Sequence, residues 1–470
     1  MKIAFVSLGC PKNLVDSEVM MGQLVGRGHA LTPEPGDADV IVVNTCSFIE
    51  SAKQEALDTI LEMAEYKKTG KAQKLIVAGC LVERYRSDIQ KDLPEVDEFV
   101  GTNELDNIVA LCEGQSARSS TIPYLYNDLT PRVLSTPRHY AYVKIAEGCD
   151  HPCTFCVIPQ YRGNFRSRRF ESVVAETTRL FAQGVREVIL IGQDTTCYGA
   201  DIGIKDGLAH LLARLAQIET SQESWVRFLY CYPNNVTQKL LDTIAEHKAL
   251  VKYIDMPLQH SSGPVLKRMK RGANGDIFLR LIERIRKTIP DVAIRTSMIV
   301  GFPGETESDF ANLCQFVEAA QFDRLGVFSY SDEDTSESYH LDGKVKAGVI
   351  YNRKRKLMAI QRHISRSRYR KLVGREFDVI VDGPSPESEL LWQARLATQA
   401  PEIDGVCYIS DPGESRLRAG EIRRLRAIEA HDYDLVGNLI DKPDRQSLPP
   451  KRNPFQIITS APNKSYQHTP

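Results

Sequence analysis

Three cysteines recur in step with an alternating pattern of strands and helices, and this pattern constrains the fold of the first 115 residues. One cysteine closely follows each of three short apolar strand patterns: Cys10, Cys46 and Cys80. The separations are 36 residues (10 to 46) and 34 residues (46 to 80), about one βαβ unit each. Because parallel strands that lead into helices end at one edge of a sheet, the three thiols should converge. The sequence predicts a parallel α/β sheet domain over residues 1–115.

A second group of three cysteines lies in a loop directly after the apolar run 140–145. Cys149, Cys153 and Cys156 have the spacing Cys-x3-Cys-x2-Cys in a segment that also contains glycine and proline. Structural zinc prefers four ligands, and iron-sulfur cubanes usually take four cysteines, so three cysteines can leave one iron open to a ligand. A zinc site or unrelated buried thiols are the alternatives for this loop, and packing of small thiols in strand-to-helix turns is the alternative for the first group. We expect two iron-sulfur sites, each with an open iron.

Composition excludes other classes of protein. The chain has 470 residues, of which 42% are apolar and 26% charged, as is typical of a globular protein with about three domains. Its longest apolar runs are far below the roughly 18 residues that span a bilayer, and it starts with a strand pattern in place of a signal peptide. Eleven cysteines, an odd number, favour reduced thiols and metal binding over a disulfide framework. We expect a cytoplasmic protein without a membrane segment.

Residues 135–365 show six strand patterns with helical spacers, which predict a partial (βα)6 barrel. Ligands in such a fold collect at the carboxyl ends of the strands. Gln193 and Asp194 follow the second strand, Arg295 lies on the fifth, and Gly301 follows it. An ordinary ion pair is an equally good interpretation of Arg295. His260, after the fourth strand, is a candidate proton donor, but a hydrogen-bonded structural role is favoured.

The loop from Glu147 to Cys156, with Phe155 just before the last cysteine, resembles the cluster loop of the radical S-adenosylmethionine (radical SAM) enzymes. Preceded by a flavodoxin-like domain with three cysteines, it is similar to the methylthiotransferases. The segment Ser7–Glu18, which reads Ser-Leu-Gly-Cys-Pro-Lys-Asn at its start, resembles the branch that modifies a ribosomal protein. The branch that modifies tRNA typically has Gln-Met-Asn after the cysteine. The resemblance covers about 440 residues of the chain.

This resemblance implies two [4Fe-4S] clusters and two molecules of SAM per reaction. The cluster on Cys149, Cys153 and Cys156 would chelate the methionine part of SAM and cleave it to a 5′-deoxyadenosyl radical, which removes a hydrogen atom from the β-carbon of an aspartate. The cluster on the first three cysteines would hold the sulfur, and the second SAM would supply the methyl group. The implied partners are a basic small-subunit ribosomal protein and a low-potential electron donor such as a flavodoxin.

The resemblance also implies contacts with SAM. The family usually has Gly-Gly-Glu after the second strand for the methionine amine, and this chain has Gly-Gln-Asp there. Gln193 and Asp194 are therefore the candidates for the amine, Arg295 for the carboxylate, and Gly301 for close approach of the adenosine. Phe155 completes the expected set.

Two further groups of residues, a run of arginines and the remaining cysteines, give less specific predictions. Four arginines follow the second cysteine loop, and they predict either a solvated face or, by resemblance, a border of the active site. Five cysteines have no partner spacing and are expected to be packing residues. The arginines are Arg162, Arg166, Arg168 and Arg169, and these cysteines are Cys112, Cys197, Cys231, Cys314 and Cys407.

The last part of the chain resembles a TRAM domain, a small antiparallel β-barrel, over residues 367–441. A basic helix with nine Lys or Arg and no acid (353–371) leads into it, and residues 442–470 are expected to be disordered. From 375 to 441 there are seven Arg and fourteen Asp or Glu, a balance of −7. Such a domain repels RNA and attracts a cationic protein, unless its acids only solvate it. Glu387, Glu389, Glu402 and Asp404 are expected to belong to this acidic surface.

The sequence favours a methylthiotransferase that modifies a ribosomal protein. A tRNA adenosine methylthiotransferase is the nearest alternative, with the same chemistry on a nucleoside. A non-catalytic iron-sulfur scaffold or electron carrier is disfavoured, because a carrier does not need a six-unit barrel.

Overall fold

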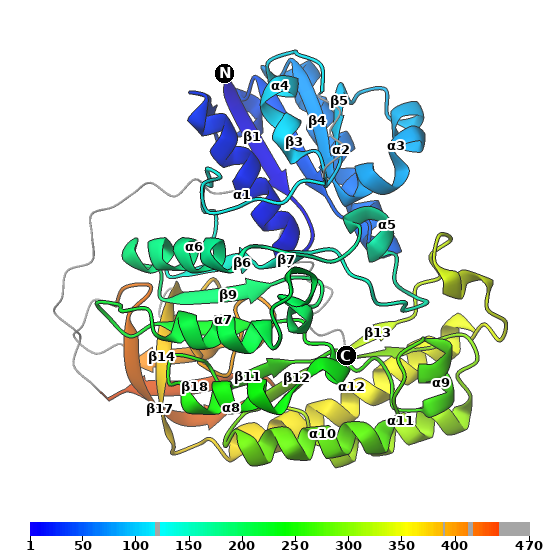
Figure 1. The fold of residues 1–470 in the computed structure, drawn as a ribbon, viewed down its shortest axis with the longest axis vertical. Helices are drawn as coiled ribbons and strands as arrows, with labels where there is room; N and C mark the ends of the chain where they lie inside the picture. Colours follow the sequence, from blue (N-terminus) through cyan, green and yellow to red (C-terminus); the bar gives the residue numbers. More distant parts are fainter. Residues whose placement is uncertain (118–122, 389–390, 412–416, 441–470) are drawn as a thin grey trace.

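The computed structural model describes residues 1–117, 123–388, 391–411 and 417–440, and it contains three packed units (Figure 1). The N-terminal unit lies above the central unit in Figure 1, and a small β-barrel, coloured orange, lies beside the central unit. In the described ranges, no helix has the length and hydropathy needed to cross a membrane. The tail expected to be disordered, residues 442–470, lies outside the described residues.

The N-terminal unit is a five-stranded parallel sheet in the order β2-β1-β3-β4-β5. Both faces are covered, because alternate residues of β1 enter different cores: Ile3 packs with residues of α1 and α4, whereas Ala4 packs with residues of α2 and α3. Burial on both sides explains the continuous apolar runs. The elements are β1 (Lys2–Ser7), α1 (Pro11–Gly26), β2 (Ala30–Leu31), β3 (Val40–Thr45), α2 (Glu50–Thr69), β4 (Lys74–Gly79), α3 (Cys80–Asp92), β5 (Glu98–Val100) and α4 (Ile108–Cys112).

The central unit is an incomplete barrel of six parallel strands, as the sequence predicts. The strands form two sheets, β10-β9-β6 and β11-β12-β13, which a bridge between Val226 and Leu250 connects. The strands are β6 (Tyr140–Lys144), β9 (Glu187–Ile191), β10 (Trp225–Phe228), β11 (Tyr253–Asp255), β12 (Ala293–Val300) and β13 (Arg324–Ser329). The short strands β7 (Ala146–Glu147) and β8 (Arg166–Ser167) pair beside the cysteine loop.

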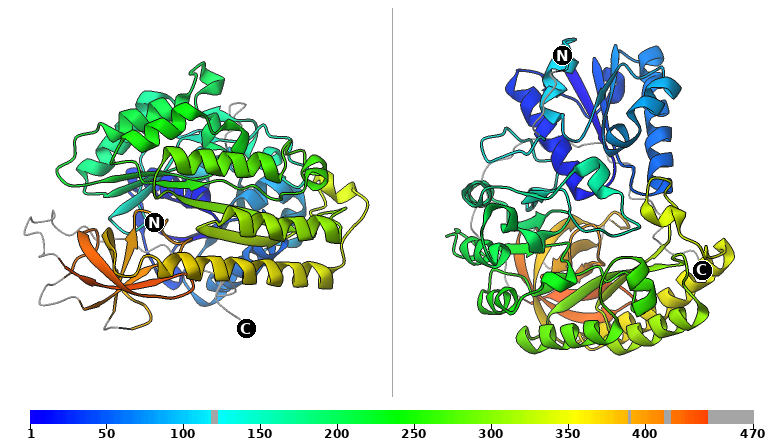
Figure 2. Two further views of the ribbon diagram at one scale, coloured as in Figure 1. Left: turned by 90° about the horizontal axis from the view of Figure 1, so that it is seen from below. Right: turned by 45° about the vertical axis from the view of Figure 1, so that its right-hand side comes forward.

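Helices surround this barrel and supply its apolar outer core. They are α6 (Phe170–Ala182), α7 (Gly207–Ala216), α8 (Gln238–Glu246), α9 (Gly263–Arg268), α10 (Gly275–Thr288), α11 (Glu307–Ala320) and α12 (Ala347–Arg370). The last of them, α12, is the expected basic helix; it packs beside β13 and leads to the small barrel (Figure 2, left). The short helix α5 (Ile158–Arg162) packs instead against Cys80 of the N-terminal unit.

The small barrel is closed in the order β14-β15-β16-β18-β17. Its neighbouring strands are antiparallel except for β16 and β18, which pair in parallel. The structure therefore confirms the expected small β-barrel and shows that one of its strand pairs is parallel. The strands are β14 (Glu376–Pro384), β15 (Trp392–Leu396), β16 (Cys407–Asp411), β17 (Ile422–Ala430) and β18 (Leu435–Leu439).

The loop between β15 and β16 closes the amino end of the central barrel. Asp404 accepts a hydrogen bond from the Tyr253 hydroxyl at 2.8 Å, and Glu402 accepts one from the Tyr140 hydroxyl at 2.7 Å. Both tyrosines begin a barrel strand. The expectation that Glu402 and Asp404 are surface acids holds for Glu402, which is exposed, and is wrong for Asp404, whose side chain is 1% exposed. Both acids bind the central barrel. Glu389 lies outside the described residues.

Candidate active site

The first three cysteines converge at the carboxyl edge of the N-terminal sheet. Gly9 has a φ of 92°, and a Cβ on it would lie 2.7 Å from the Cβ of Cys46, so the Cys10 turn lies against Cys46. Asn13 connects the same turns by donating to the Leu8 and Thr45 carbonyls. Burial, together with the nearby Cys80 and Cys10 thiols, raises the pKa of Cys46 to about 12. The predicted convergence is confirmed.

The second cysteine loop folds tightly beside the carboxyl ends of the barrel strands. Gly148 has a φ of 84°, and a Cβ there would lie 2.1 Å from the Asn164 carbonyl oxygen, so only glycine fits this close approach. Burial raises the pKa of Cys156 to about 12, to which the nearby thiols of the loop contribute. Arg271 places its Nη1 atom 3.6 Å from the Cys153 sulfur. The three thiols of this loop therefore lie near one another.

Two buried cations lie between the two triads and neutralise two acids. Lys144 Nζ lies 2.5 Å from Asp16 and 2.5 Å from Glu147. Arg162 Nη1 lies 2.7 Å from Asp16, and its Nη2 donates to the Cys80 sulfur at 3.3 Å. Burial alone would raise the pKa of Glu147, but Lys144 and Arg162 hold it at about 2. Because Glu147 directly precedes the second cysteine loop, this network connects the triads.

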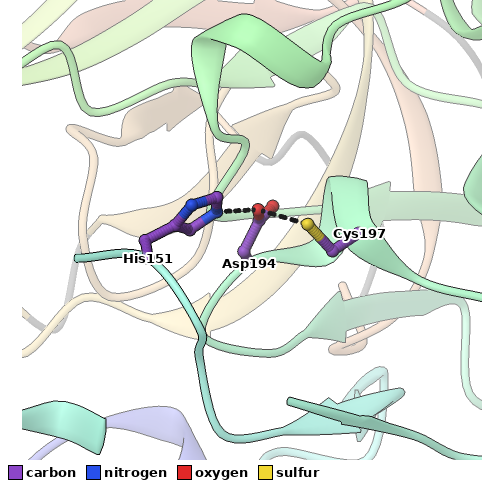
Figure 3. A group of neighbouring side chains, drawn as sticks. All are labelled: His151, Asp194 and Cys197. Atoms are coloured by element: carbon purple, nitrogen blue, oxygen red, sulfur yellow. Dashed lines mark hydrogen bonds and ion pairs between the residues drawn. The ribbon is translucent and has the colours of Figure 1, made fainter. Parts of the chain in front are cut away.

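A histidine of the second loop is held by an aspartate (Figure 3). His151 Nε2 lies 2.6 Å from Asp194 Oδ2, and the His151 ring stacks on Tyr232 at 3.7 Å between centroids. Burial alone would raise the pKa of Asp194, but the hydrogen bonds from His151 and Thr196 hold it below its ordinary value. Cys197, expected to be a packing residue, instead donates to Asp194 at 3.0 Å. Asp194 thus positions the cysteine loop.

Gln193 retains a free acceptor at this place. Its Nε2 donates to Glu147 Oε1 at 2.6 Å, whereas its buried Oε1 has no hydrogen-bond partner among the described residues. An amine donor such as the methionine part of SAM would satisfy this buried atom. Of the two residues predicted for the amine, Gln193 fits and Asp194 is already engaged.

The other three residues predicted to bind SAM are Arg295, Gly301 and Phe155, and each of them contacts another residue of the central unit. Arg295 forms an ion pair with Asp255 at 2.6 Å, as the alternative interpretation held. Gly301 has a φ of 80°, and its N–H donates to Glu305. Phe155 is half-buried and lies edge-on to Phe302, with 6.4 Å between ring centroids.

Both triads fit iron-sulfur clusters better than zinc. All eleven cysteines are free thiols. Within the described ranges, His151, Asp194 and Cys197 are the only group of three or more such side chains whose ligand atoms all lie within 4.8 Å of one another. A tetrahedral zinc with bonds of about 2.3 Å would hold its sulfurs about 3.8 Å apart. The wider spacing of the triads therefore disfavours the zinc alternative.

The remaining candidates are the arginine run, His260 and the cysteines without partner spacing. Arg162 and Arg168 are buried and Arg169 is exposed, so the arginine run is a border of the site at one end and a solvated face at the other. His260 is fully buried, and its Nδ1 accepts from the Ser262 N–H at 2.9 Å, as expected of a hydrogen-bonded structural residue. Four cysteines are buried packing residues as expected: Cys112, Cys231, Cys314 and Cys407.

Sequence reasoning missed two lysines at the junction, by which we mean the region between the two cysteine triads. Lys144 is a lone charge in an otherwise apolar buried strand, and this anomaly was a usable signal. Lys12 lies two residues after Cys10, and its Nζ is 3.1 Å from the centroid of the Tyr230 ring. Burial lowers the pKa of Lys12 to about 8, although Cys10 and Asp255 act to raise it. No local pattern distinguishes Lys12 from a surface lysine.

Known families match each of the three units. Residues 2–101 match the Uncharacterized protein family UPF0004, residues 143–317 the Radical SAM superfamily, and residues 373–440 the TRAM domain.

The fold is similar to solved radical SAM structures. The radical S-adenosylmethionine methyltransferase TsrM from Kitasatospora setae superposes with a TM-score of 0.52 at 13% identity, covering 70% of this chain and 72% of that chain. At this identity the similarity supports the fold alone.

Relatives match nearly the whole chain. A protein of Solibacter usitatus named ribosomal protein uS12 methylthiotransferase RimO is 74% identical, covering 94% of this chain and 95% of its own length. Proteins of the same name from Koribacter versatilis and Geobacter sulfurreducens are 57% and 46% identical, each covering 93% of this chain and 96% or 98% of their own length. With both cysteine triads in place, these similarities show that the chain belongs to the ribosomal protein uS12 methylthiotransferase family.

Proposed function

We propose that this chain is a radical SAM enzyme that adds a methylthio group to the β-carbon of an aspartate in ribosomal protein uS12. The observation that carries the proposal is the junction of two triads of free thiols, one from each α/β unit, within a single network of buried charges. A C–H bond at a β-carbon is too inert for acid-base chemistry near neutral pH, so the reaction needs a radical and a stored sulfur. Two separate sites in one chain match these two needs.

The residues that would hold the cofactors belong to different units. Cys149, Cys153 and Cys156 would hold one [4Fe-4S] cluster together with SAM, and the triad of the N-terminal sheet would hold the other. When bound, these groups supply a radical that removes hydrogen from a C–H bond, a sulfur atom and a methyl group. Gln193 is proposed to bind the methionine amine through its unpartnered Oε1.

The protein's own residues position these groups and exclude water. Asp194 fixes His151 at 2.6 Å, and this contact holds the second cysteine loop against the end of β9. Lys144 and Arg162 neutralise Asp16 and Glu147, which allows the two triads to approach in a dry environment. We include in the proposal a low-potential electron donor such as a flavodoxin and a cytoplasmic location, where ribosomal substrates are found.

One anaerobic assay tests the function. Reconstituted protein is incubated with SAM, dithionite, uS12 and tRNA side by side, and the products are read by mass spectrometry. We expect 5′-deoxyadenosine and a methylthio group on a uS12 aspartate. Modified tRNA with unmodified uS12 would instead support the tRNA adenosine reaction, and absence of 5′-deoxyadenosine would leave only an iron-sulfur carrier.

The same assay tests the division between the triads. Cys46→Ala removes a ligand of the N-terminal triad, so SAM cleavage should continue while methylthio transfer stops. Cys153→Ala should abolish SAM cleavage itself. Equal loss of cleavage in both variants would contradict the assignment of separate tasks.

A further inference from the structure

Lys12 is a buried cation without an anionic partner. It lies in the first turn of α1, two residues after Cys10, and it is 8% exposed. Its Nζ lies over the Tyr230 ring, 3.1 Å from the centroid. In residues 1–117, 123–388, 391–411 and 417–440, no oxygen accepts a hydrogen bond from this Nζ and no carboxylate forms an ion pair with it. A ring face replaces only part of the hydration of an ammonium, so Nζ retains the capacity to bind an anion.

Other buried cations of this region, in contrast to Lys12, have carboxylate partners. Lys144 has two carboxylate partners, and Arg132 lies 2.5 Å from Glu18. The Cys10 thiol, a proposed cluster ligand, and the carboxylates Asp255 and Glu147 lie near Lys12. Asp255 Oδ1 is bound by Arg295 at 2.6 Å and its Oδ2 accepts the Tyr230 N–H at 3.0 Å, and Glu147 is paired with Lys144. Among the described residues, the Lys12 ammonium is therefore available to bind an anion from outside the chain.

The position of Lys12 indicates which anion this is. Cys10 belongs to the N-terminal triad, whereas Tyr230 and Asp255 follow or end barrel strands β10 and β11 at the carboxyl edge, where the ligands of such a barrel collect. An anion on Lys12 would lie between the two sites. If the proposed function is correct, the reacting β-carbon is bonded directly to a carboxylate, so a cation that holds this carboxylate also fixes the C–H bond between the radical source and the sulfur.

We propose that Lys12 Nζ binds the side-chain carboxylate of the substrate aspartate; this inference rests on the proposed function. A carboxylate also occurs on SAM, and the two sources have the same chemistry. Lys12 then sets specificity, because a neutral side chain in the aspartate's place would leave the ammonium buried and unpaired. The Tyr230 ring, on which the ammonium rests, keeps Nζ in place.

The test compares two uS12 peptides, one with the target aspartate and one with asparagine at that position. Their dissociation constants are measured by fluorescence anisotropy on reconstituted protein with SAM and without reductant, so that no turnover occurs. We expect the parent to bind the aspartate peptide at least about tenfold more tightly. Lys12→Met, which keeps the length and removes the charge, should bring the ratio close to one, and Lys12→Arg should keep part of it.

Lys91→Met is the matched control, since Lys91 is an exposed lysine of α3 in the same domain. It should keep the parent's ratio, and iron content verifies that each variant holds its clusters. The affinity for SAM, measured on the same proteins, identifies the carboxylate. Weaker SAM binding by Lys12→Met with an unchanged peptide ratio would overturn the proposal in favour of the SAM carboxylate.

The parent alone also decides the question if Lys12→Met fails to fold. A parent that modifies uS12 yet binds both peptides equally would overturn this inference and leave the proposed function standing. A parent that does not modify uS12 would remove the proposed function, and the inference with it.

Discussion

Buried charges at the junction are paired across the units of the chain. Arg162 is the last residue of α5, and its partner Asp16 lies on α1 of the N-terminal unit. Lys144 of β6 shares Asp16 with it. Such pairs are costly to break, because removal of one partner leaves the other charge buried and uncompensated.

Replacing Arg162 by methionine should therefore destabilise the junction. Asp16 and Glu147 would share the single cation Lys144, at a cost of about 3–5 kcal/mol. We expect the thermal midpoint of the reconstituted protein to fall by roughly 5–10 °C in calorimetry. Arg169→Met is the control, since this exposed arginine of the same run should be neutral. A fall of the same size in both variants would contradict the assigned role.

The six cysteines predict the metal content. Anaerobically reconstituted protein should hold about eight irons per chain, because each triad accounts for one [4Fe-4S] cluster. Cys149→Ala and Cys10→Ala should each lose about half of this iron in a colorimetric assay. A parent content near four irons would remove the second cluster.

At the scale of elements, local patterns could be predicted and contacts between units could not. The ends of β1, β3 and β4 place Cys10, Cys46 and Cys80 at one edge, and strand periodicity is enough to infer this. The partners of Asp404 depend on how the small barrel docks, which no spacing in the sequence encodes. Charge alone therefore predicts Asp404 to be a surface acid, whereas its side chain is 1% exposed.

The docking of β15 against the central barrel has its own buried ion network. Glu187 of β9 lies 2.7 Å from Arg227 of β10 and 2.7 Å from Arg395 of β15. Burial alone would raise the pKa of Glu187, but Arg395 and Arg227 hold it below its ordinary value of 4.5. A carboxyl group whose folded pKa is lowered adds stability above its unfolded pKa and loses it as the pH falls through the folded value.

Glu187→Gln should therefore lower the thermal midpoint most at neutral pH. The difference from the parent should shrink as the pH falls below about 4.5, because Glu187 of the unfolded parent then binds a proton while the folded protein keeps the charge down to its lower pKa. Protein without clusters is used for these melts, so that acid lability of the clusters does not contribute. Glu171→Gln, at an exposed position of α6, should show no such pH dependence. A constant difference from pH 7 to pH 3 would contradict the assigned pKa.

At the scale of the whole molecule, some acids of the small barrel are already bound by other parts of the chain, so fewer of them are available at its surface than the composition suggests. Asp404 is directed into the central barrel, and Asp432 is bound by Arg366 of α12 at 2.7 Å. Exposed acids remain at Glu387 and Glu429. The prediction that an acidic surface attracts the cationic substrate therefore depends on residues such as these two.

Reversing Glu387 and Glu429 to lysine should slow capture of uS12, since steering acts over a Debye length of about 10 Å at 0.1 M salt. Stopped-flow association rates should fall several-fold at low salt, and the difference should vanish near 1 M salt, where the Debye length is about 3 Å. The control reverses Glu62 and Glu219, which are also exposed but lie outside the small barrel. Both double variants change the net charge by the same amount, so only a local acidic surface makes the first one slower. Equal rates in the two variants would mean that the acids of the small barrel serve its solubility and its docking, and that capture of the substrate depends on other surfaces.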